Sequence, residues 1–299
     1  MPRGVRIITR GVLHCRTNGR SPAGMNRRVI INADEMGIDE PRSYGILEAH
    51  EKGVVTSASI MANSPHLESL SGLLREHAGL GVGVHLNLTE GSPILSHPHT
   101  LVDRQGHFFD KSEARRRLME GRLDLEEIRS EFDLQIRRVK DAGIEPTHLD
   151  SLHHIHVYPG VMTAVCWAAQ RHGIEKVRLP REPVPLPGSV PSQVYWELVR
   201  YQGLVTKAAD VLFAEGMKTS DHFRGIAFSG GIHFDRFLDV LARLPEGTTE
   251  VMVRPGKREP GGKSFVSEDR ERELRILTDP ETRSAISKYG IELISYRKL

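Results

Sequence analysis

The feature that most constrains this fold is the alternation of short apolar segments with helix-compatible segments, which begins at Arg28 and continues almost to the C-terminus. The apolar segments lie at 29–34, 54–62, 81–87, 147–156, 176–179, 225–228, 249–254 and 292–295. Segments with helical spacing separate most of them, at 40–52, 64–77, 112–143, 161–172, 234–244 and 268–277. Because strands that alternate with helices form βαβ units, this order predicts a parallel sheet. The number of strands favours an α/β fold in the form of a distorted (β/α) barrel, with an open doubly wound sheet as the alternative.

Polar side chains gather where several of the apolar segments end. Asp34 and Glu35 follow the first segment, His85 and Asn87 end the third, and Arg254 ends the segment at 249–254. Barrel enzymes carry their catalytic groups at the C-terminal ends of the strands, so this distribution predicts an active site at that end. Two alternatives stay open: Asp34 could cap the following helix, and His85 could be a core histidine with satisfied hydrogen bonds.

The segment 147–156 is rich in histidine, with four His and one Asp within nine residues. In a strand, alternate side chains share a face, so one face would carry Asp150, Leu152, His154 and His156. His153 would then lie on the opposite face. Neutral imidazole binds borderline metals and transfers protons near neutral pH, so the row indicates a hydrolytic site. A solvated histidine cluster is the alternative.

Composition excludes several classes of protein. The net charge is +2, and Lys and Arg are scattered among Asp and Glu, so we expect no nucleic-acid partner. No window approaches the roughly 18 apolar residues that a membrane-spanning helix needs, and no glycine-rich phosphate-binding motif is present. Cys15 and Cys166 are neither spaced as a zinc pair nor numerous enough for a disulfide scaffold. We therefore expect a reducing cytoplasm.

Two segments stand apart from the alternation. Residues 1–24 contain five Arg and no acidic residue, and we expect a disordered basic extension that precedes a single domain at 25–299. The segment 180–191 is rich in proline and is expected to form a long surface loop.

Three segments together resemble one known family. They are 32–37 (Asn-Ala-Asp-Glu-Met-Gly), 83–89 (Gly-Val-His-Leu-Asn-Leu-Thr) and 147–151 (Thr-His-Leu-Asp-Ser), and they look like the YdjC/ChbG/HpnK family of carbohydrate deacetylases. The segments 46–49, 54–57 and 250–256 fit the same pattern, and the likeness extends over about 28–295. The resemblance implies a distorted (β/α) barrel and a divalent metal, magnesium or zinc, that helps to hydrolyse an N-acetyl group from a sugar.

The resemblance also implies roles for individual residues. Asp34 corresponds to the general base, and Glu35 and His85 correspond to metal ligands. The third ligand position is occupied by Leu152, and a local bulge could bring His153 round to replace it. For the remaining chemistry we predict catalytic roles for Arg254, as oxyanion stabiliser, and His154, as acid. We predict that the substrate contacts Asn87, Asp150 and His156.

Three departures from the family pattern fall on these positions. Glu35 replaces an Asp, Leu152 replaces a His and Arg254 replaces a His. A leucine side chain has no lone pair to give a metal, and an arginine is a fixed cation. A non-hydrolytic sugar-binding or regulatory relative that has lost the metal site is therefore the alternative function. A glycosidase that uses Asp34 and Asp150 as its carboxylate pair is a further alternative. We expect a small carbohydrate as partner, and leave a homodimer open.

Overall fold

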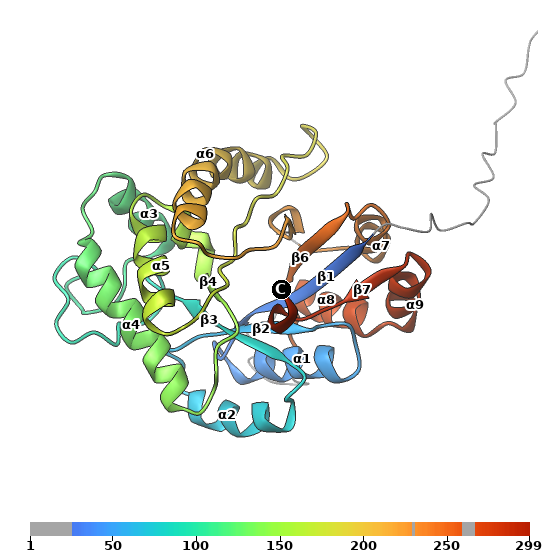
Figure 1. Cartoon of the computed structure of the whole chain (residues 1–299), viewed down its shortest axis with the longest axis horizontal. Helices are drawn as coiled ribbons and strands as arrows, with labels where there is room; N and C mark the ends of the chain where they lie inside the picture. Colours follow the sequence, from blue (N-terminus) through green and yellow to red (C-terminus); the bar gives the residue numbers. More distant parts are fainter. Residues whose placement is uncertain (1–25, 229–230, 259–266) are drawn as a thin grey trace, which may run out of the picture.

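The strands of the computed structural model, which describes residues 26–228, 231–258 and 267–299, all run parallel in one curled sheet (Figure 1). They are β1 (Arg27–Met36), β2 (Ser57–Ile60), β3 (Gly81–Leu86), β4 (Leu149–Ser151), β5 (His222–Arg224), β6 (Gly247–Val253) and β7 (Ile291–Leu293). Their order is β4-β3-β2-β1-β6-β5, and β7 pairs with the start of β1.

Single bridges continue this sheet beyond β4. Leu149 pairs with Val177, and Lys176 pairs with Lys218, which lies just before β5 in the chain. The pairing therefore runs round towards the opposite edge of the sheet, and the predicted distorted barrel is confirmed. Instead of the expected strand at 176–179, the structure has two single bridges, at Lys176 and at Val177.

Helices surround the sheet (Figure 1). In the described residues they are α1 (Glu40–Glu51), α2 (Leu67–Glu76), α3 (Lys111–Met119), α4 (Leu125–Asp141), α5 (Val161–Arg171), α6 (Ser192–Ala214), α7 (Phe234–Ala242), α8 (Glu268–Thr278) and α9 (Pro280–Lys288). Three short 3₁₀ helices are η1 (Leu152–Val157), η2 (Ile226–Phe228) and η3 (Tyr296–Lys298). With helices outside, a strand is covered on both faces, which explains why every residue of β2 and β3 is buried.

Several sequence-based boundaries were wrong. The segment 112–143 forms two helices, because Asp124 accepts a hydrogen bond from the backbone of Glu126 and begins α4 as a new helix. The segment 225–228 forms η2, and the adjacent strand is β5. The helices α6 and α9 were not predicted. The proline-rich segment 180–191 has the expected loop structure, and residues 1–24, with Cys15, lie outside the described residues.

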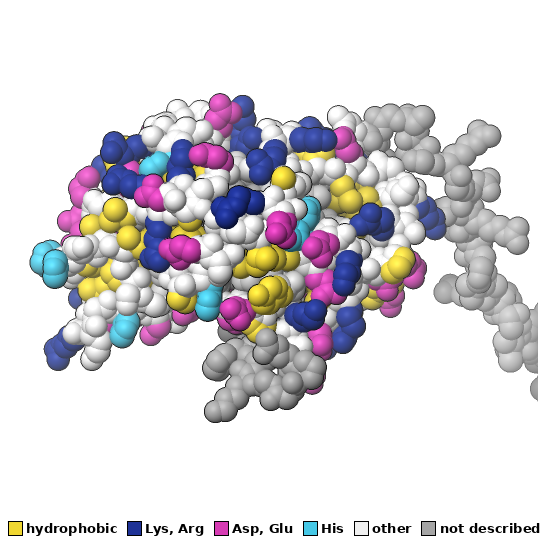
Figure 2. All heavy atoms as spheres, turned by 90° about the horizontal axis from the view of Figure 1, so that it is seen from below, with side chains coloured by type: hydrophobic (Ala, Val, Ile, Leu, Met, Phe, Trp, Pro, Cys, Tyr) yellow, Lys and Arg dark blue, Asp and Glu magenta, His cyan; other side chains and the backbone are white. Residues whose placement is uncertain are grey.

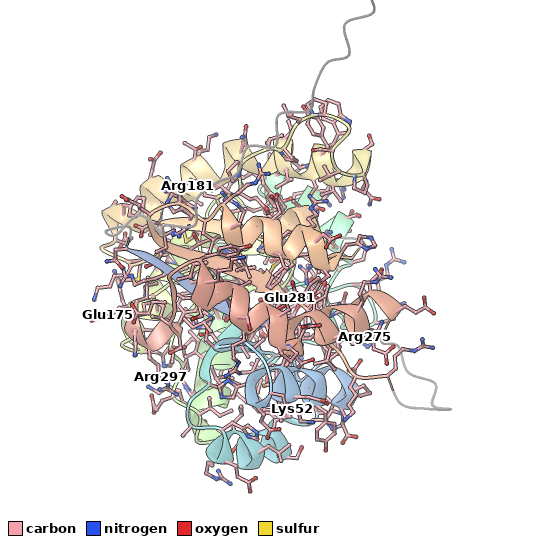
Figure 3. The ribbon with its side chains drawn as sticks, turned by 90° about the vertical axis from the view of Figure 1, so that its right-hand side faces the viewer. Lys52, Glu175, Arg181, Arg275, Glu281 and Arg297 are labelled. Atoms are coloured by element: carbon pink, nitrogen blue, oxygen red, sulfur yellow. The ribbon has the colours of Figure 1, made fainter. Side chains whose placement is uncertain are left out.

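The outer surface carries charges of both signs. Basic and acidic side chains are interspersed over the face shown in Figure 2. Figure 3 places Glu175 and Arg275 at the periphery, and Glu175 forms an exposed ion pair with Lys218 at 2.7 Å. Among the described helices, none is both long enough and apolar enough to cross a membrane.

Candidate functional site

The site begins at an irregularity near the end of β1. The register between β1 and β2 shifts between Ala33 and Met36, and Glu35 has a φ of 73°. A positive φ at a non-glycine residue turns the chain sharply, so Asp34 and Glu35 meet different neighbours. Asp34 lies in the buried interior and Glu35 lies nearer the surface. The helix-cap alternative for Asp34 is wrong, because Asp39 caps α1.

Asp34 belongs to a buried network around Arg178. The Arg178 guanidinium donates to both oxygens of Asp34 at 2.7 and 2.8 Å, and it lies 2.7 Å from Asp150 and 2.7 Å from Glu250. All three carboxylates and the guanidinium are almost inaccessible to solvent. Burial raises the pKa of Glu250 in spite of the nearby Arg178. One guanidinium therefore faces three carboxyl groups, and the raised pKa of Glu250 reduces the charge that it must balance.

His85 joins the network through Asp150. Its Nδ1 lies 2.7 Å from Asp150 Oδ1, and Ser59 Oγ donates to the other oxygen at 2.7 Å. Burial acts to lower the pKa of His85, but the charges of Asp150 and Asp34 outweigh it and raise the pKa. Asp150 thus orients the imidazole and leaves Nε2 without a hydrogen-bond partner among the described residues. The alternative role of His85 was a core histidine with satisfied hydrogen bonds. The residue is buried, but among the described residues only its Nδ1 has a hydrogen-bond partner.

The histidine-rich segment is a strand over only three residues. After Ser151 the chain enters η1, and His153 and His154 have φ values of 57° and 52°. Two successive left-handed residues break the strand's alternation, so the predicted common face of Asp150, Leu152, His154 and His156 was wrong. The carbonyl of His153 accepts hydrogen bonds from Arg115 and Tyr201, which stabilise this turn.

The imidazoles of this segment face different surroundings. His153 Nδ1 lies 3.0 Å from Thr89 Oγ1, and burial together with the charges of Lys111 and Arg115 lowers its pKa to about 3. His154 is buried, and neither ring nitrogen has a partner in the described residues. Burial and the charge of Arg178 lower the pKa of His154 well below its usual value. Both rings are therefore neutral near pH 7.

Glu35 is held by two arginines. Its carboxylate lies 3.1 Å from Arg254 Nε and 2.7 Å from Arg270. Burial alone would raise the pKa of Glu35, but these two charges hold it below its ordinary value. Arg254 and Glu35 are two of the three departures from the family pattern, and the positive charge of Arg254 offsets the negative charge of Glu35.

The three residues predicted to contact substrate make internal hydrogen bonds. Asn87 Oδ1 accepts from the backbone of Thr89 and Glu90, and Asp150 is shared by His85 and Arg178. His156 lies 2.5 Å from Ser151 Oγ and 3.1 Å from the Arg178 carbonyl. All three are fully buried, and their substrate contacts stay predictions.

Two sets of residues are candidates for binding a metal ion. In the predicted set, Leu152 offers no ligand, the Glu35 carboxylate is bound by two arginines, and His153 Nδ1 lies 3.0 Å from Thr89 Oγ1. Within the described residues, the group that could hold an ion is Asp34, His85 and Asp150, with one ligand atom from each within 4.8 Å of the others. His85 belongs to both sets, and ligand roles for Glu35 and His153 stay predictions.

Two observations fit a cation at the group of Asp34, His85 and Asp150. Asn32 Nδ2 donates to Asp34 at 2.9 Å, and its buried Oδ1 has no partner among the described residues. An unsatisfied buried acceptor is commonly paired with a water or an ion. The network also contains three carboxyl groups and one guanidinium, and this imbalance likewise favours a bound cation. Arg178 already contacts Asp34 and Asp150, so a bound ion would share both carboxylates with it.

Sequence reasoning missed Arg178, Glu250 and Ser59. The signal for Arg178 is a charge flanked by Val177 and Leu179, because a buried charge needs partners that fix its place. The sequence also left open whether Asp34 and Asp150 act as the carboxylate pair of a glycosidase. Asp34 and Asp150 both accept from the same buried guanidinium, which leaves them poorly placed to flank a sugar ring.

The curled parallel sheet carries buried carboxylates and an imidazole at the carboxyl ends of β1, β3 and β4, which is where (β/α) barrels carry their active sites. The family model for YdjC-like proteins matches residues 28–288, and the chain belongs to this family.

Relatives and a solved structure extend this likeness. A carbohydrate deacetylase from Geobacillus stearothermophilus is 35% identical, with 92% of this chain and 98% of the relative covered. A chitooligosaccharide deacetylase from Enterobacter sp. (strain 638) is 32% identical, with coverage of 92% and 100%. A solved structure from Enterococcus faecalis V583, described as a candidate for cellobiose-phosphate cleavage, has a TM-score of 0.73 and 28% identity, with coverage of 91% and 98%.

Proposed function

We propose that this protein is a carbohydrate deacetylase that hydrolyses the N-acetyl group of an amino sugar. The observation that carries the proposal is the likeness over about nine-tenths of the chain to relatives named as carbohydrate deacetylases. The buried Asp34, His85 and Asp150 group supports it, because amide hydrolysis needs a polarised carbonyl and a group that accepts a proton from water.

We propose that Asp34, His85 and Asp150 hold a divalent ion, magnesium or zinc. When bound, such an ion lowers the pKa of a coordinated water and polarises a carbonyl oxygen. Asp150 also orients the ring of His85, because its Oδ1 lies 2.7 Å from His85 Nδ1. Arg178 holds Asp34 and Asp150 in place and offsets part of their charge.

The resemblance assigns the proton of the attacking water to Asp34, which therefore has two proposed roles, ligand and base. Arg254 can stabilise a developing oxyanion, but its guanidinium keeps its proton and cannot serve as the acid. His154 is neutral at rest because its pKa lies far below the usual value, so it can donate a proton only after it has taken one. The roles of Arg254 and His154 stay proposals.

A second candidate is a sugar-binding relative that does not hydrolyse its ligand. The specific observation in its favour is the clamp of Arg254 and Arg270 on Glu35, beside a ligand position occupied by Leu152. A small carbohydrate is the proposed partner of either candidate. A reducing cytoplasm stays a proposal, supported by the free, buried Cys166, and a homodimer stays a proposal as well.

One experiment separates the two candidates. The purified protein is analysed for bound metal, and acetate release from N,N′-diacetylchitobiose is measured after removal of metal and after addition of Zn²⁺ or Mg²⁺. For a deacetylase we expect acetate release that depends on the added ion and is lost in His85→Ala. Tight sugar binding without acetate release at any metal concentration would establish the binding relative instead.

A further inference from the structure

A cavity of about 630 Å³ lies between α3 and α6, outside the residues that we assign to the catalytic site. Its volume falls within the range of roughly 300–1,000 Å³ that is common for small-molecule sites. Apolar surface on its walls comes from Tyr158, Leu204 and Met119, and Met119 is 58% exposed. An exposed methionine beside a cavity offers an adaptable contact to an apolar ligand.

Two of the four cations that line this cavity are not paired with acids. Among its lining residues, Arg115 pairs with Glu197, and Arg116 pairs with Glu113 and Glu120. Arg200 and Lys207, by contrast, have no ion pair in the part of the chain that the structure describes, and no Asp or Glu lines the cavity. They are seven residues apart on α6, which is about two helical turns, so both lie on the same side of the helix.

The cavity also contains an unsatisfied buried donor. Tyr158 is 2% exposed, and its hydroxyl has no hydrogen-bond partner in the described residues. Burial raises the pKa of Tyr158, although the charges of Arg115 and Arg200 and the approach of the Arg200 side chain to the hydroxyl oppose this rise, so the hydroxyl keeps its proton and can donate it to an acceptor. A buried hydroxyl without a partner is uncommon and is explained when a ligand or water accepts from it.

We propose that this cavity binds an amphipathic organic anion, in which a carboxylate or phosphate is joined to an apolar or aromatic body. The body packs against Met119 and Leu204, and the anionic group is bound by Arg200 and Lys207. Tyr158 donates a hydrogen bond to the same ligand. An uncharged sugar would leave both cations without a counter-charge, so this site is distinct from the proposed sugar site and does not depend on it.

Isothermal titration calorimetry of the full chain tests the proposal with four probes. We expect 1-naphthyl phosphate or 1-naphthoate to bind with a stoichiometry of one, and the stronger of the two identifies the anionic group. We expect 1-naphthol and inorganic phosphate, which carry only the body or only the charge, to bind at least about tenfold more weakly. Equal binding of 1-naphthol would reduce the site to an apolar cavity and overturn the proposal, as would equal binding of inorganic phosphate.

Variants locate the binding. Arg200→Gln and Lys207→Gln each remove one cation, and we expect each to weaken binding of the preferred probe by about tenfold. We expect Tyr158→Phe, which keeps the ring, to weaken it several-fold. The matched controls are Arg104→Gln and Lys298→Gln, exposed residues that have no ion pair in the described chain and do not line the cavity. Equal loss in the controls, or no loss in the cavity variants, would place the binding elsewhere and refute the assignment. No turnover is measured, so this outcome is independent of the deacetylase.

Discussion

The network around Arg178 predicts an unusually large effect for one substitution, Arg178→Met. This change keeps most of the side-chain volume but removes the cation that contacts Asp34, Asp150 and Glu250 at 2.7–2.9 Å. Because all four groups are buried, three carboxylates would be left without their cation. Breaking a buried ion pair costs about 3–5 kcal/mol. With a shift of about 2–4 °C per kcal/mol for a chain of this size class, the midpoint of thermal unfolding should fall by roughly 6–20 °C.

The pH dependence of the stability loss in Arg178→Met identifies the cause of that loss. Burial opposes ionisation of Asp150, but Arg178 and His85 hold its pKa below the ordinary value. In the wild type, Asp150 therefore adds stability at neutral pH, and this contribution is lost only as the pH falls through the low folded-state pKa. In Arg178→Met, burial raises the folded-state pKa, so ionisation destabilises the fold at neutral pH. We expect the difference in unfolding free energy between the two proteins to be largest near pH 7 and to shrink towards about pH 4.

Thermal unfolding followed by circular dichroism measures the midpoint, and urea-induced unfolding in the presence of EDTA at about pH 7 and about pH 4.5 measures the loss of unfolding free energy and its pH dependence. Arg104→Met is the matched control, because Arg104 is exposed and has no ion pair in the described residues. A loss below about 1 kcal/mol for Arg178→Met, comparable to a surface substitution, would refute the reasoning. An equal loss at both pH values would show that packing and not charge is responsible.

Three further predictions concern the site and the sheet. In Asp34→Asn we expect bound metal, measured by mass spectrometry, and acetate release to fall together, the latter at least about 100-fold; retention of the metal would leave Asp34 only the role of base. In Leu152→His combined with Arg254→His we expect zinc affinity by calorimetry to rise at least about tenfold over Leu152→Met, and no rise would exclude that position as a ligand. In Gly83→Ala the added Cβ would lie 2.4 Å from the buried ring of His148. Overpacking of this kind costs about 1–3 kcal/mol in urea unfolding, whereas Gly203→Ala meets open space in α6 and should cost nothing.

The fold could be predicted because its main determinant is local. A parallel strand covered on both faces favours a continuous apolar run, and such runs mark β1 at 29–31 and β6 at 251–253 in the sequence. The helix α6 was missed although Val194, Leu198, Tyr201 and Leu212 line its buried side. Exposed Trp196 and Phe213 put apolar residues on its outer side too, and the amphipathic pattern that identifies a surface helix is thereby lost.

The site could be predicted only in part, because its contacts are distant in sequence. Asp34 and Arg178 are 144 residues apart, and nothing in either segment alone indicates the pairing. The positions of Asp34 and His85 at the ends of strands were predicted, and the structure brings them together with Asp150. The placing of Asp150 and His153 depends on backbone angles after Ser151 that the sequence does not reveal.

The backbone of His153 and His154 explains why alternation failed here. Left-handed conformations of non-glycine residues cost about 1–3 kcal/mol each and persist only where the surroundings fix them. The fixing contacts come from α3 and α6, because Arg115 and Tyr201 both donate to the carbonyl of His153. Arg115 also lines the proposed anion site, so that cavity and the histidine segment share one structural support. In this strained turn His153 Nδ1 lies 3.0 Å from Thr89 Oγ1, and Leu152 is buried. The geometry of the histidine segment is thus set by two helices that contribute none of the proposed ligands.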